Sequence, residues 1–436
     1  MSPLEPPSSI FHRNPVHKYP AASSGDGIYI TAKDGSKTLD GSSGAAVSCL
    51  GHGHPAVIDA IVQQARQMAF AHTSFFTSGP AEELAALLVA SGGEDAFKKC
   101  MFVSSGSEAV ESALKVARQY HIANGKPNRV NIISRRHSYH GNTLGAMAAG
   151  WNPSRREPFA PMLSPVFHHV SPFFYSRDGR PDESADGYCQ RMIDEFDEMF
   201  ASLGPNTVAA VMVETASGAT LGAVPATSQY LRRLRNLCHK HGALLILDEV
   251  MCGMGRLGRT HAWQAIGGSS PDIQTIGKGL GAGYQPISAV LVSPSVHNAI
   301  ENAHGEHPFV TGHTYQGHSI GCAAALATQK YIEEQHLLQN VQRNGELLTK
   351  ELASAVPGLK EVRGSGMFQA VEFQSTPDDP IAAKVAKACM KNGLAVYLCS
   401  PLVDAVLFAP PFIITECEIQ LMVSIFVRSV TEVVVG

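Results

Sequence analysis

The sequence predicts an α/β protein whose larger part is built on a mostly parallel sheet and is followed by a smaller α+β domain. Between residues 99 and 292, short β-branched apolar runs alternate with helical stretches, which is typical of parallel strands covered by helices on both faces. From residue 319 the chain becomes mainly helical, with a strand-like run among the helices. With 44% hydrophobic and 17% charged residues, the chain of 436 residues has the composition of an ordered, densely packed protein.

The first part of the chain, up to about residue 46, is rich in Pro, Ser and Gly and is expected to form an arm and a small ribbon. The dipeptide Asp34-Gly35 lies between alternating residues, which predicts a hairpin. Apolar residues at helical spacing predict one helix over residues 54–68 and a second over residues 80–91. Two helices therefore precede the first residues that indicate chemistry.

The central part of the chain contains a series of predicted strands. Each is a short apolar run bounded by turn or helix signals, as expected for strands buried in a parallel sheet. The irregular stretch over residues 164–187, with its Pro, Ser and Tyr residues, is expected to lie at the surface or near the site. The predicted strands are residues 100–104, 130–134, 207–214, 243–248, 272–277 and 288–292.

The C-terminal part is predicted to contain helices over residues 319–335 and 339–356, a strand over residues 366–373, a further helix and a final helix after Thr415. We therefore divide the chain into three segments. Residues 1–50 form the arm and part of the small domain, residues 51–318 form the large domain, and residues 319–436 form the C-terminal small domain.

Composition and charge exclude several classes of protein. The 34 Lys and Arg residues against 38 Asp and Glu give a net charge of −4, so no basic field is available for nucleic acid or for anionic membranes. Nine cysteines with no CxxC pair indicate reduced thiols. The N-terminal residues show no secretory signal and no apolar run is long enough for a membrane span, so a cytoplasmic location is expected. The 19 histidines fit no ligand pattern, and no metal is assigned.

The first candidate site is the run Ser104-Ser105-Gly106-Ser107, which joins a predicted strand directly to a helix. Exposed backbone N–H groups at a helix N-terminus, a glycine and serine hydroxyls together suit a phosphate group. An ordinary serine N-cap with Glu108 in the first turn explains the same residues. The run alone leaves both interpretations open.

A buried strand delivers Asp248 and Glu249 at its carboxyl end, where open α/β sheets bind their ligands. A carboxylate there can keep a heterocyclic nitrogen protonated, although a capping or ion-paired acid is the plainer explanation. The nearby run over residues 253–258 matches GxGxxG, the dinucleotide-binding pattern. It lacks a following helix and an acid about 20 residues on, so an NAD-binding oxidoreductase is only a remote alternative.

Lys278 follows another predicted strand and is surrounded by glycines. A lysine in a glycine-rich bend after a buried strand is poorly explained as a surface charge, and the P-loop pattern is absent. Partial burial lowers the pKa of an amine and makes it a nucleophile, so a Schiff-base lysine explains the position better. A phosphate site, an acid at a strand end and this lysine are the contacts that pyridoxal 5′-phosphate requires.

With these motifs in order, the chain resembles a class III, omega-type aminotransferase of the fold type I pyridoxal-phosphate family. The resemblance extends from the run GDGIYITAKDGSKTLDGSSGAAVSCLGHGHPAVIDAI to APPFIITECEI, and so covers nearly the whole chain. It implies a large domain with a mostly parallel seven-stranded sheet. It also implies pyridoxal phosphate as cofactor and a homodimer or larger homo-oligomer with shared active sites.

The resemblance also implies roles for individual residues. Lys278 matches the lysine that forms the Schiff base and moves the proton, and Asp248 matches the partner of the pyridine nitrogen; these two are the predicted catalytic residues. Without the resemblance, core packing or turn formation would explain Tyr139, Glu214, Val250 and Thr314. Thr314 is expected to reach a phosphate in the neighbouring subunit. The predicted cofactor-binding residues are Ser105, Gly106, Ser107, Tyr139, His140, Glu214, Asp248, Val250, Lys278 and Thr314.

The function implied is transfer of an amino group from an amine or amino acid to a 2-oxo acid or aldehyde. The runner-up is decarboxylation or epimerisation of an amino acid on the same fold. Relatives commonly carry an arginine shortly before the Pro410-Pro411 motif, and residues 393–412 contain none. A second carboxylate then lacks an obvious anchor, so a monocarboxylate such as pyruvate, or an aldehyde, is the expected acceptor rather than 2-oxoglutarate. Arg155 and Arg156 are the first candidates to replace the arginine.

Overall fold

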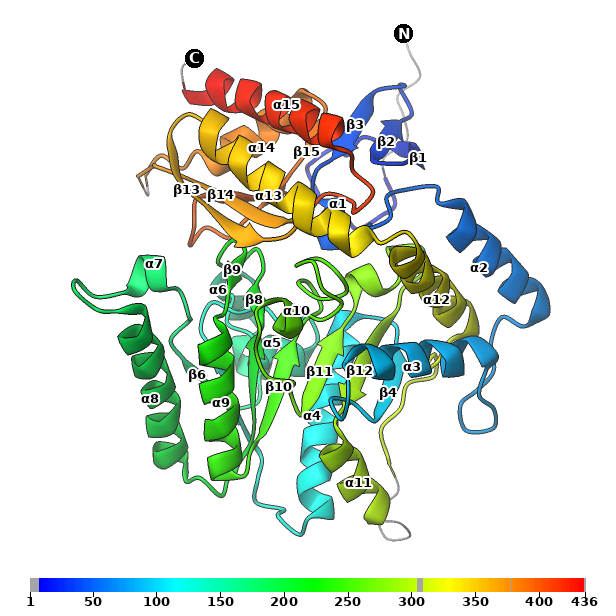
Figure 1. Cartoon of the computed structure of the whole chain (residues 1–436), viewed down its shortest axis with the longest axis vertical. Coiled ribbons are helices and arrows are strands. Elements are labelled where there is room, and N and C mark those ends of the chain that lie inside the picture. Colours follow the sequence, from blue (N-terminus) through cyan, green and yellow to red (C-terminus); the bar gives the residue numbers. More distant parts are fainter. Residues whose placement is uncertain (1–7, 304–308, 377, 435–436) are drawn as a thin grey trace.

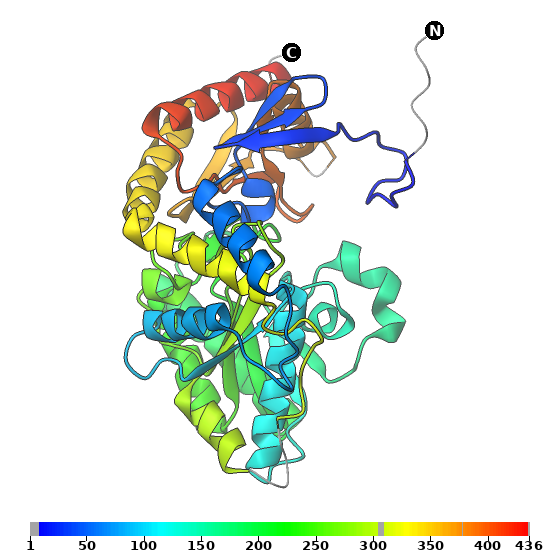
Figure 2. The ribbon, with the colours of Figure 1, turned by 90° about the vertical axis from the view of Figure 1, so that its right-hand side faces the viewer.

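A computed structural model describes residues 8–303, 309–376 and 378–434 of the protein. These residues form two lobes (Figure 1): the lower contains a central sheet between helices, and the upper contains shorter strands beside long helices. In Figure 2 the segment ahead of the first strand extends away from the upper lobe. The predicted α/β fold with a smaller α+β part is confirmed.

Within the described residues, the sheet of the lower lobe has seven strands, which are β4 (Lys99–Val103), β5 (Asn131–Arg135), β6 (Phe167–Val170), β7 (Val208–Glu214), β10 (Leu244–Asp248), β11 (Ile273–Ile276) and β12 (Ser288–Val292). Their order across the sheet is β4-β12-β11-β10-β7-β5-β6. Among these strands β12 alone runs opposite to the others, antiparallel to both β4 and β11, and all remaining pairs are parallel. The predicted seven-stranded, mostly parallel sheet is therefore confirmed, and each of the predicted central strands is present.

Helices cover both faces of this sheet. Apolar residues of α3 (Gly79–Ser91), α8 (Ala185–Leu203) and α9 (Ser228–His241) pack on one face, and those of α4 (Gly106–Ala123) and α11 (Pro294–Asn302) pack on the other. Every residue of β7 and β10 is buried. Strands covered on both faces must be apolar on both, which explains why these two read as continuous apolar runs.

The stretch over residues 164–187 is more regular than its sequence predicts. It contains β6, the helix α7 (Tyr175–Asp178) and the start of α8. β6 is an edge strand of four residues, FHHV, that pairs only with β5. Its two histidines hide the apolar pattern, and pairing with β5 rather than intrinsic preference makes it a strand. The prediction of an irregular stretch was therefore wrong for residues 167–170, 175–178 and 185–187.

The upper lobe contains strands from both ends of the chain. In the part that the structure describes, β1 (Ala22–Asp26), β2 (Tyr29–Ala32), β3 (Lys37–Asp40) and β15 (Leu394–Ala395) form one sheet. The predicted hairpin at Asp34-Gly35 joins β2 and β3, and β3 pairs with β15 in parallel. The division of the chain at residues 50 and 318 stays a prediction, and residues 1–7 of its first segment lie outside the described residues.

A second sheet of the upper lobe has the order β13-β14-β17-β16 among the described strands, which are β13 (Leu359–Ser365), β14 (Phe368–Phe373), β16 (Tyr397–Leu398) and β17 (Ala405–Phe408). The sequence predicted β14 but not β13, because charged residues interrupt the apolar alternation of LKEVRGS. Long helices cover these strands and share one apolar core with them. They are α13 (Leu337–Ala355), α14 (Ala382–Lys391) and α15 (Glu416–Val434).

The remaining elements are short or connect the lobes. The helices α2 (Pro55–Gln67) and α12 (Ser319–Glu334) lie side by side where the two lobes meet. Two further strands, β8 (Ala216–Ser217) and β9 (Val224–Pro225), pair with each other beside the site described below. The short helices are α1 (Ser43–Ala46), α5 (Leu144–Ala149), α6 (Pro153–Arg156), α10 (Ala262–Ala265), η1 (Glu157–Met162) and η2 (Lys278–Leu280).

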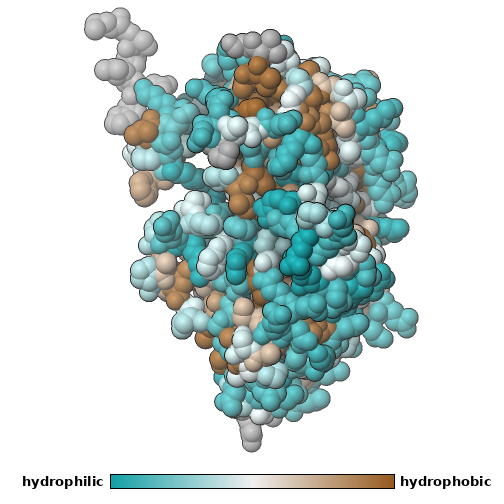
Figure 3. Space-filling model, turned by 90° about the vertical axis from the view of Figure 1, so that its left-hand side faces the viewer, coloured by the Kyte–Doolittle hydropathy of each residue, from teal (hydrophilic) through white to brown (hydrophobic). Residues whose placement is uncertain are grey.

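The surface and the cysteines fit a packed protein. On the flank seen in Figure 3 hydrophilic residues predominate, and the larger apolar areas lie over the upper lobe. All nine cysteines are free, and Cys417 is the exposed one. Burial raises the pKa of the Cys49, Cys322 and Cys399 thiols to about 12. No helix of the described residues is long and apolar enough to cross a membrane.

Candidate active site

A cavity of about 600 Å³ lies where the carboxyl ends of β5, β7, β10 and β11 face the upper lobe. Parallel strands bring their carboxyl ends to one edge, which is where open α/β sheets hold their ligands. The cavity collects eight of the ten predicted site residues: Gly106, Ser107, Tyr139, His140, Glu214, Asp248, Val250 and Lys278.

The N-terminus of α4 forms one wall of the cavity. Ser105 is its N-cap, and the Ser105 hydroxyl accepts a hydrogen bond of 3.2 Å from the backbone N–H of Glu108. Gly106 packs on Val250, and a Cβ at Gly106 would lie 2.6 Å from Val250 Cγ1. The N-cap interpretation is confirmed for Ser105, whereas Gly106 and Ser107 line the cavity, where a phosphate site stays a prediction. The positive end of an 18-residue helix faces the place predicted for a phosphate.

Asp248 is held in one orientation by three hydrogen bonds. Its Oδ1 accepts from the backbone N–H of Val250 and from the Thr275 hydroxyl, both at 3.0 Å. Its Oδ2 lies 2.7 Å from Nδ1 of His140, and both side chains are buried. The other ring nitrogen of His140, Nε2, is buried without a hydrogen-bond partner. The carboxylate is thus fixed at the cavity wall beside a polar atom that the described residues leave unsatisfied.

Lys278 begins η2, separated from the end of β11 by Gly277, and has a positive φ of 43°. Its amine makes no hydrogen bond or ion pair with the described residues. Burial lowers the pKa of this amine to about 8, although Asp248, Cys252 and Glu214 act to raise it. A sizeable fraction of the amine is therefore neutral, and so nucleophilic, at mildly alkaline pH.

Glu214 ends β7 next to Asp248 in the register of the sheet. Its two oxygens accept hydrogen bonds from the Ser217 hydroxyl at 3.1 Å and the Gly218 N–H at 3.3 Å. Burial raises the pKa of its carboxyl group. Glu214 therefore joins the cavity to the turn that follows β8.

Glu249, which neighbours Asp248 in sequence, has a different role. It is fully buried and accepts hydrogen bonds of 2.7–2.8 Å from the Thr215 hydroxyl, the Gln274 amide and the backbone N–H groups of Ala262 and Trp263. Burial raises the pKa of this carboxyl group to about 7 despite these bonds. Glu249 holds the start of α10 and does not line the cavity, so Asp248 is the acid that faces it.

Thr314 lies apart from the cavity of its own chain. It is exposed, in the turn before α12. The cavity-lining residues of the described chain do not include it. Its predicted contact with a neighbouring subunit stays a prediction, since only one chain is described.

The two arginines proposed as anchors separate clearly. Arg155 lines the cavity, and its guanidinium carbon lies 5.3 Å from the centre of the Tyr139 ring. Arg156 donates to the backbone oxygens of Ala148 and Gly150 and stacks on Trp151 at 4.5 Å. Arg156 therefore supports the local fold, whereas Arg155 faces the site.

Sequence reasoning missed the remaining wall of the cavity. The turn over residues 218–220 and the loop over residues 397–401 line it, together with Arg13 from the N-terminal segment. None of these segments carries a residue pattern that indicates a site. Only their meeting across the two lobes places them there.

Comparison with known proteins identifies the family. The family described as class-III aminotransferases matches residues 11–430. The chain belongs to this family, and it is a pyridoxal-phosphate-dependent aminotransferase of fold type I. The decarboxylase or epimerase and the NAD-binding oxidoreductase were alternatives to this function, and no relative described below is named as either.

Individual relatives agree with this membership. An uncharacterized aminotransferase of Schizosaccharomyces pombe is 36% identical over 98% of this chain and 95% of its own length. The diaminobutyrate–2-oxoglutarate transaminase of Halomonas elongata is 32% identical over 94% of this chain and 89% of its own. An amine transaminase from an uncultivated Pseudomonas species, solved with pyridoxal phosphate bound, superposes with a TM-score of 0.91 at 31% identity, covering 98% of this chain and 100% of that one.

The residues of the cavity fit pyridoxal phosphate. Gly106 and Ser107 offer backbone N–H groups to a phosphate, Asp248 offers a fixed carboxylate to the pyridine nitrogen, and Lys278 offers an unpaired amine. Tyr139 and Val250 supply flanking surfaces for the ring. The cofactor supplies an electron sink that stabilises negative charge on the substrate carbon. With the cofactor bound, Lys278 would accept and return the proton at its amine, and Asp248 would hold a proton at the ring nitrogen.

Uptake of pyridoxal phosphate by the apoenzyme should become faster as the pH rises through about 8. The neutral form of the Lys278 amine, which would hold the cofactor as a Schiff base, predominates above its lowered pKa. Stopped-flow absorbance measures this rate. In Lys278→Ala, the rate of cofactor uptake should no longer depend on pH in this way. Turnover should fall by at least about 10³-fold, while the variant still binds the cofactor through its other contacts. A midpoint near 10.5, the ordinary lysine value, would contradict the burial argument.

Asp248→Asn should fold normally and lose about 10² to 10⁴-fold in the single-turnover rate with an amine donor, because an amide cannot hold the proton at the ring nitrogen. Glu249→Gln is the matched control. This substitution neutralises the acid next to Asp248, which does not line the cavity, so it should affect thermal stability more than the single-turnover rate. An Asp248→Asn enzyme as fast as the wild type would transfer the role to another acid.

Proposed function

We propose that the amino acceptor of this aminotransferase is a small 2-oxo acid with a single carboxylate, of which pyruvate is the simplest. An aldehyde, the other acceptor expected from the sequence, would need no anchor at all. The proposal keeps the sequence-based argument that residues 393–412 contain no arginine. A dicarboxylate needs a second charge-assisted contact to offset the desolvation of its distal carboxylate.

The observation that supports this proposal is the position of Arg155. Arg155 lines the cavity, its guanidinium lies over the Tyr139 ring, and no carboxylate of the described residues pairs with it. An unpaired guanidinium that faces a ligand cavity matches one carboxylate by a bidentate pair. Arg13 also lines the cavity, but it belongs to the described segment ahead of β1, residues 8–21, which has no helix or strand to hold it. We therefore assign the carboxylate contact to Arg155.

The test compares pyruvate with 2-oxoglutarate as acceptors for one shared amine donor. The wild type should show the higher kcat/KM with pyruvate by about tenfold or more. Arg155→Gln should lower kcat/KM for pyruvate by about 10- to 100-fold, mainly through KM, since it removes a charge-assisted contact. Arg13→Gln is the matched control and should leave the pyruvate value within about twofold.

A preference for 2-oxoglutarate would overturn the proposal, and loss of that preference in Arg13→Gln would identify Arg13 as the second anchor. The comparison of the two acceptors is a demanding test, because one relative, the diaminobutyrate–2-oxoglutarate transaminase of Halomonas elongata, is named for this dicarboxylate. The products should be identified by mass spectrometry. Carbon dioxide or inverted substrate would indicate decarboxylation or epimerisation instead of amino transfer.

We also propose that a second copy of the chain completes the active site. Aromatic residues are exposed on two neighbouring loops, with Phe75 78%, Phe76 67% and Tyr315 58% accessible. The loops touch, since the rings of Phe70 and Tyr315 lie 5.6 Å apart. Thr314 belongs to the same surface and lies away from its own cavity. An exposed apolar patch next to Thr314, a predicted site residue that does not line the cavity of its own chain, supports a homodimer with shared sites.

Coexpression of two inactive variants tests this arrangement. Lys278→Ala and Thr314→Ala subunits should complement each other, because each mixed dimer regains one intact site. Random pairing should then restore about a quarter of the wild-type activity per subunit. The double variant Phe75→Glu, Phe76→Glu should shift the protein towards monomers in sedimentation velocity. A fully active wild-type monomer would contradict the proposal.

A further inference from the structure

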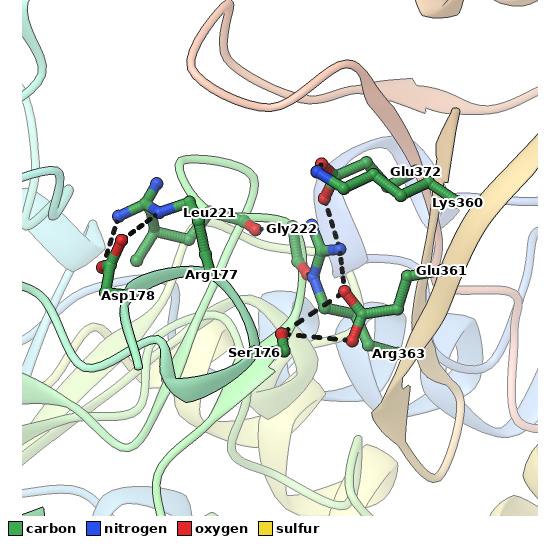
Figure 4. A network of polar contacts seen from close by, with 9 residues as sticks. All are labelled: Ser176, Arg177, Asp178, Leu221, Gly222, Lys360, Glu361, Arg363 and Glu372. Carbon is green, nitrogen blue, oxygen red and sulfur yellow. Dashed lines mark hydrogen bonds and ion pairs between the residues drawn. The ribbon is translucent and has the colours of Figure 1, made fainter. Parts of the chain in front are cut away.

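Arg363 is a buried arginine at the boundary of the lobes that the chemistry described above does not use. It lies on β13 with 8% of its surface exposed. Its Nε donates to the backbone oxygen of Gly222 at 2.7 Å, and its Nη2 donates to that of Leu221 at 2.9 Å. Figure 4 shows the guanidinium between this turn of the lower lobe and acidic residues of the upper lobe. One side chain thus binds both lobes.

The charge of Arg363 is balanced inside a closed network. Its Nη1 lies 2.5 Å from Glu372 and 3.0 Å from Glu361. Lys360 pairs with the other oxygen of Glu372 at 2.6 Å, and the Ser176 hydroxyl donates to Glu361 at 3.3 Å. Two cations and two anions leave no net charge for a further ion. The network therefore acts as a clamp, and it does not form a ligand site.

The clamp holds the turn over residues 218–222, which connects β8 with β9. Gly222 has a φ of 73°, and a Cβ there would lie 2.7 Å from Nη2 of Arg363, so the close approach requires glycine. The N–H groups of Gly222 and Ala223 both donate to the Gly218 oxygen and close the turn on itself. The opposite end of the turn is bound by Glu214 through the Gly218 N–H.

This turn is also a wall of the active-site cavity, because residues 218–220 line it. The upper lobe binds it a second time through Ser400, whose N–H and hydroxyl donate at 2.8 Å to the backbone oxygens of Ala219 and Thr220. Ser400 lines the cavity itself. The distance between the turn and the loop of residues 397–401 therefore depends on contacts that Arg363 and Ser400 make across the lobes.

We propose that Arg363 is a positioning residue that fixes the turn of residues 218–222 and so sets the width of the cavity for substrates. The inference rests on the amino-transfer activity of the family and not on the identity of the acceptor. By holding two consecutive carbonyl groups, the planar guanidinium excludes the rotations that would move the turn away from Ser400. The enzyme then distinguishes amine donors of different bulk by the position of this turn, which Arg363 fixes from outside the cavity.

Arg363→Lys tests the clamp while it keeps a positive charge beside Glu372. A lysine amine cannot reach two carbonyls and two carboxylates in the planar geometry of arginine. Hydrogen exchange of the peptide that covers residues 215–226 should become faster. The ratio of kcat/KM between a small and a bulky amine donor should fall by about 10- to 100-fold, while the absorbance of the bound cofactor stays unchanged.

The matched control is Lys360→Met, which removes a cation of the same network without touching the turn. Lys360 binds Glu372 from a side chain that is 54% exposed. In Lys360→Met, the hydrogen-exchange rate of residues 215–226 and the ratio of kcat/KM between the small and the bulky donor should stay within about twofold of the wild type. If Arg363→Lys lowers thermal stability but leaves turn exchange and the donor ratio unchanged, Arg363 is merely structural and the proposal fails.

Gly222→Ala disturbs the contact between Arg363 and the turn by changing the turn itself. It replaces Arg363→Lys as the test if that variant does not fold. The added methyl group meets the guanidinium, so the same changes in exchange and donor ratio are expected. Gly204→Ala is its control, since Gly204 has a similar φ of 86° but its Cβ would meet only Thr207 at 3.6 Å. Equal donor ratios in the two alanine variants would also overturn the proposal.

Discussion

The register between β7, β10 and β11 is the constraint on which the active site depends. Asp248 pairs with Glu214 on one side and with Thr275 on the other, and Lys278 follows Thr275 by three residues. The parallel ladder therefore brings two acids and an amine together before any side-chain contact is made. A shift of β10 by one residue would turn Asp248 to the opposite face of the sheet and separate it from Glu214 and Lys278.

The same ladder sets the electrostatics of the site. The carboxyl ends of these strands are buried. This burial lowers the pKa of the Lys278 amine and raises the pKa of the Glu214 carboxyl group. Such burial is costly unless polar atoms find partners, and Asp248 has three. His140 keeps one nitrogen without a partner, so the site retains unsatisfied polarity at the place where a ligand binds.

Much of this arrangement could be predicted from the sequence, because it depends on local patterns. Buried strands ending in Asp248 or leading to Lys278 are visible as apolar runs followed by polar or glycine-rich residues. The edge strand β6 and the strand β13 were missed, since pairing with neighbours outweighs their weak patterns. The side chains of Arg155 and Arg156 differ in direction, and the turn of residues 218–222 lines the cavity. Both facts follow from tertiary packing, which neighbouring residues in the sequence do not encode.

The burial of the cysteines has a practical consequence. A reagent that reacts with thiolates meets little competition from Cys49, Cys100, Cys322 or Cys399, because burial raises the pKa of each to about 12. Cys417 is exposed in the first turn of α15 and is the natural target. The wild-type sequence thus already carries one preferred attachment point for a fluorophore or a solid support, on the outer helix of the upper lobe and outside the set of residues that line the cavity.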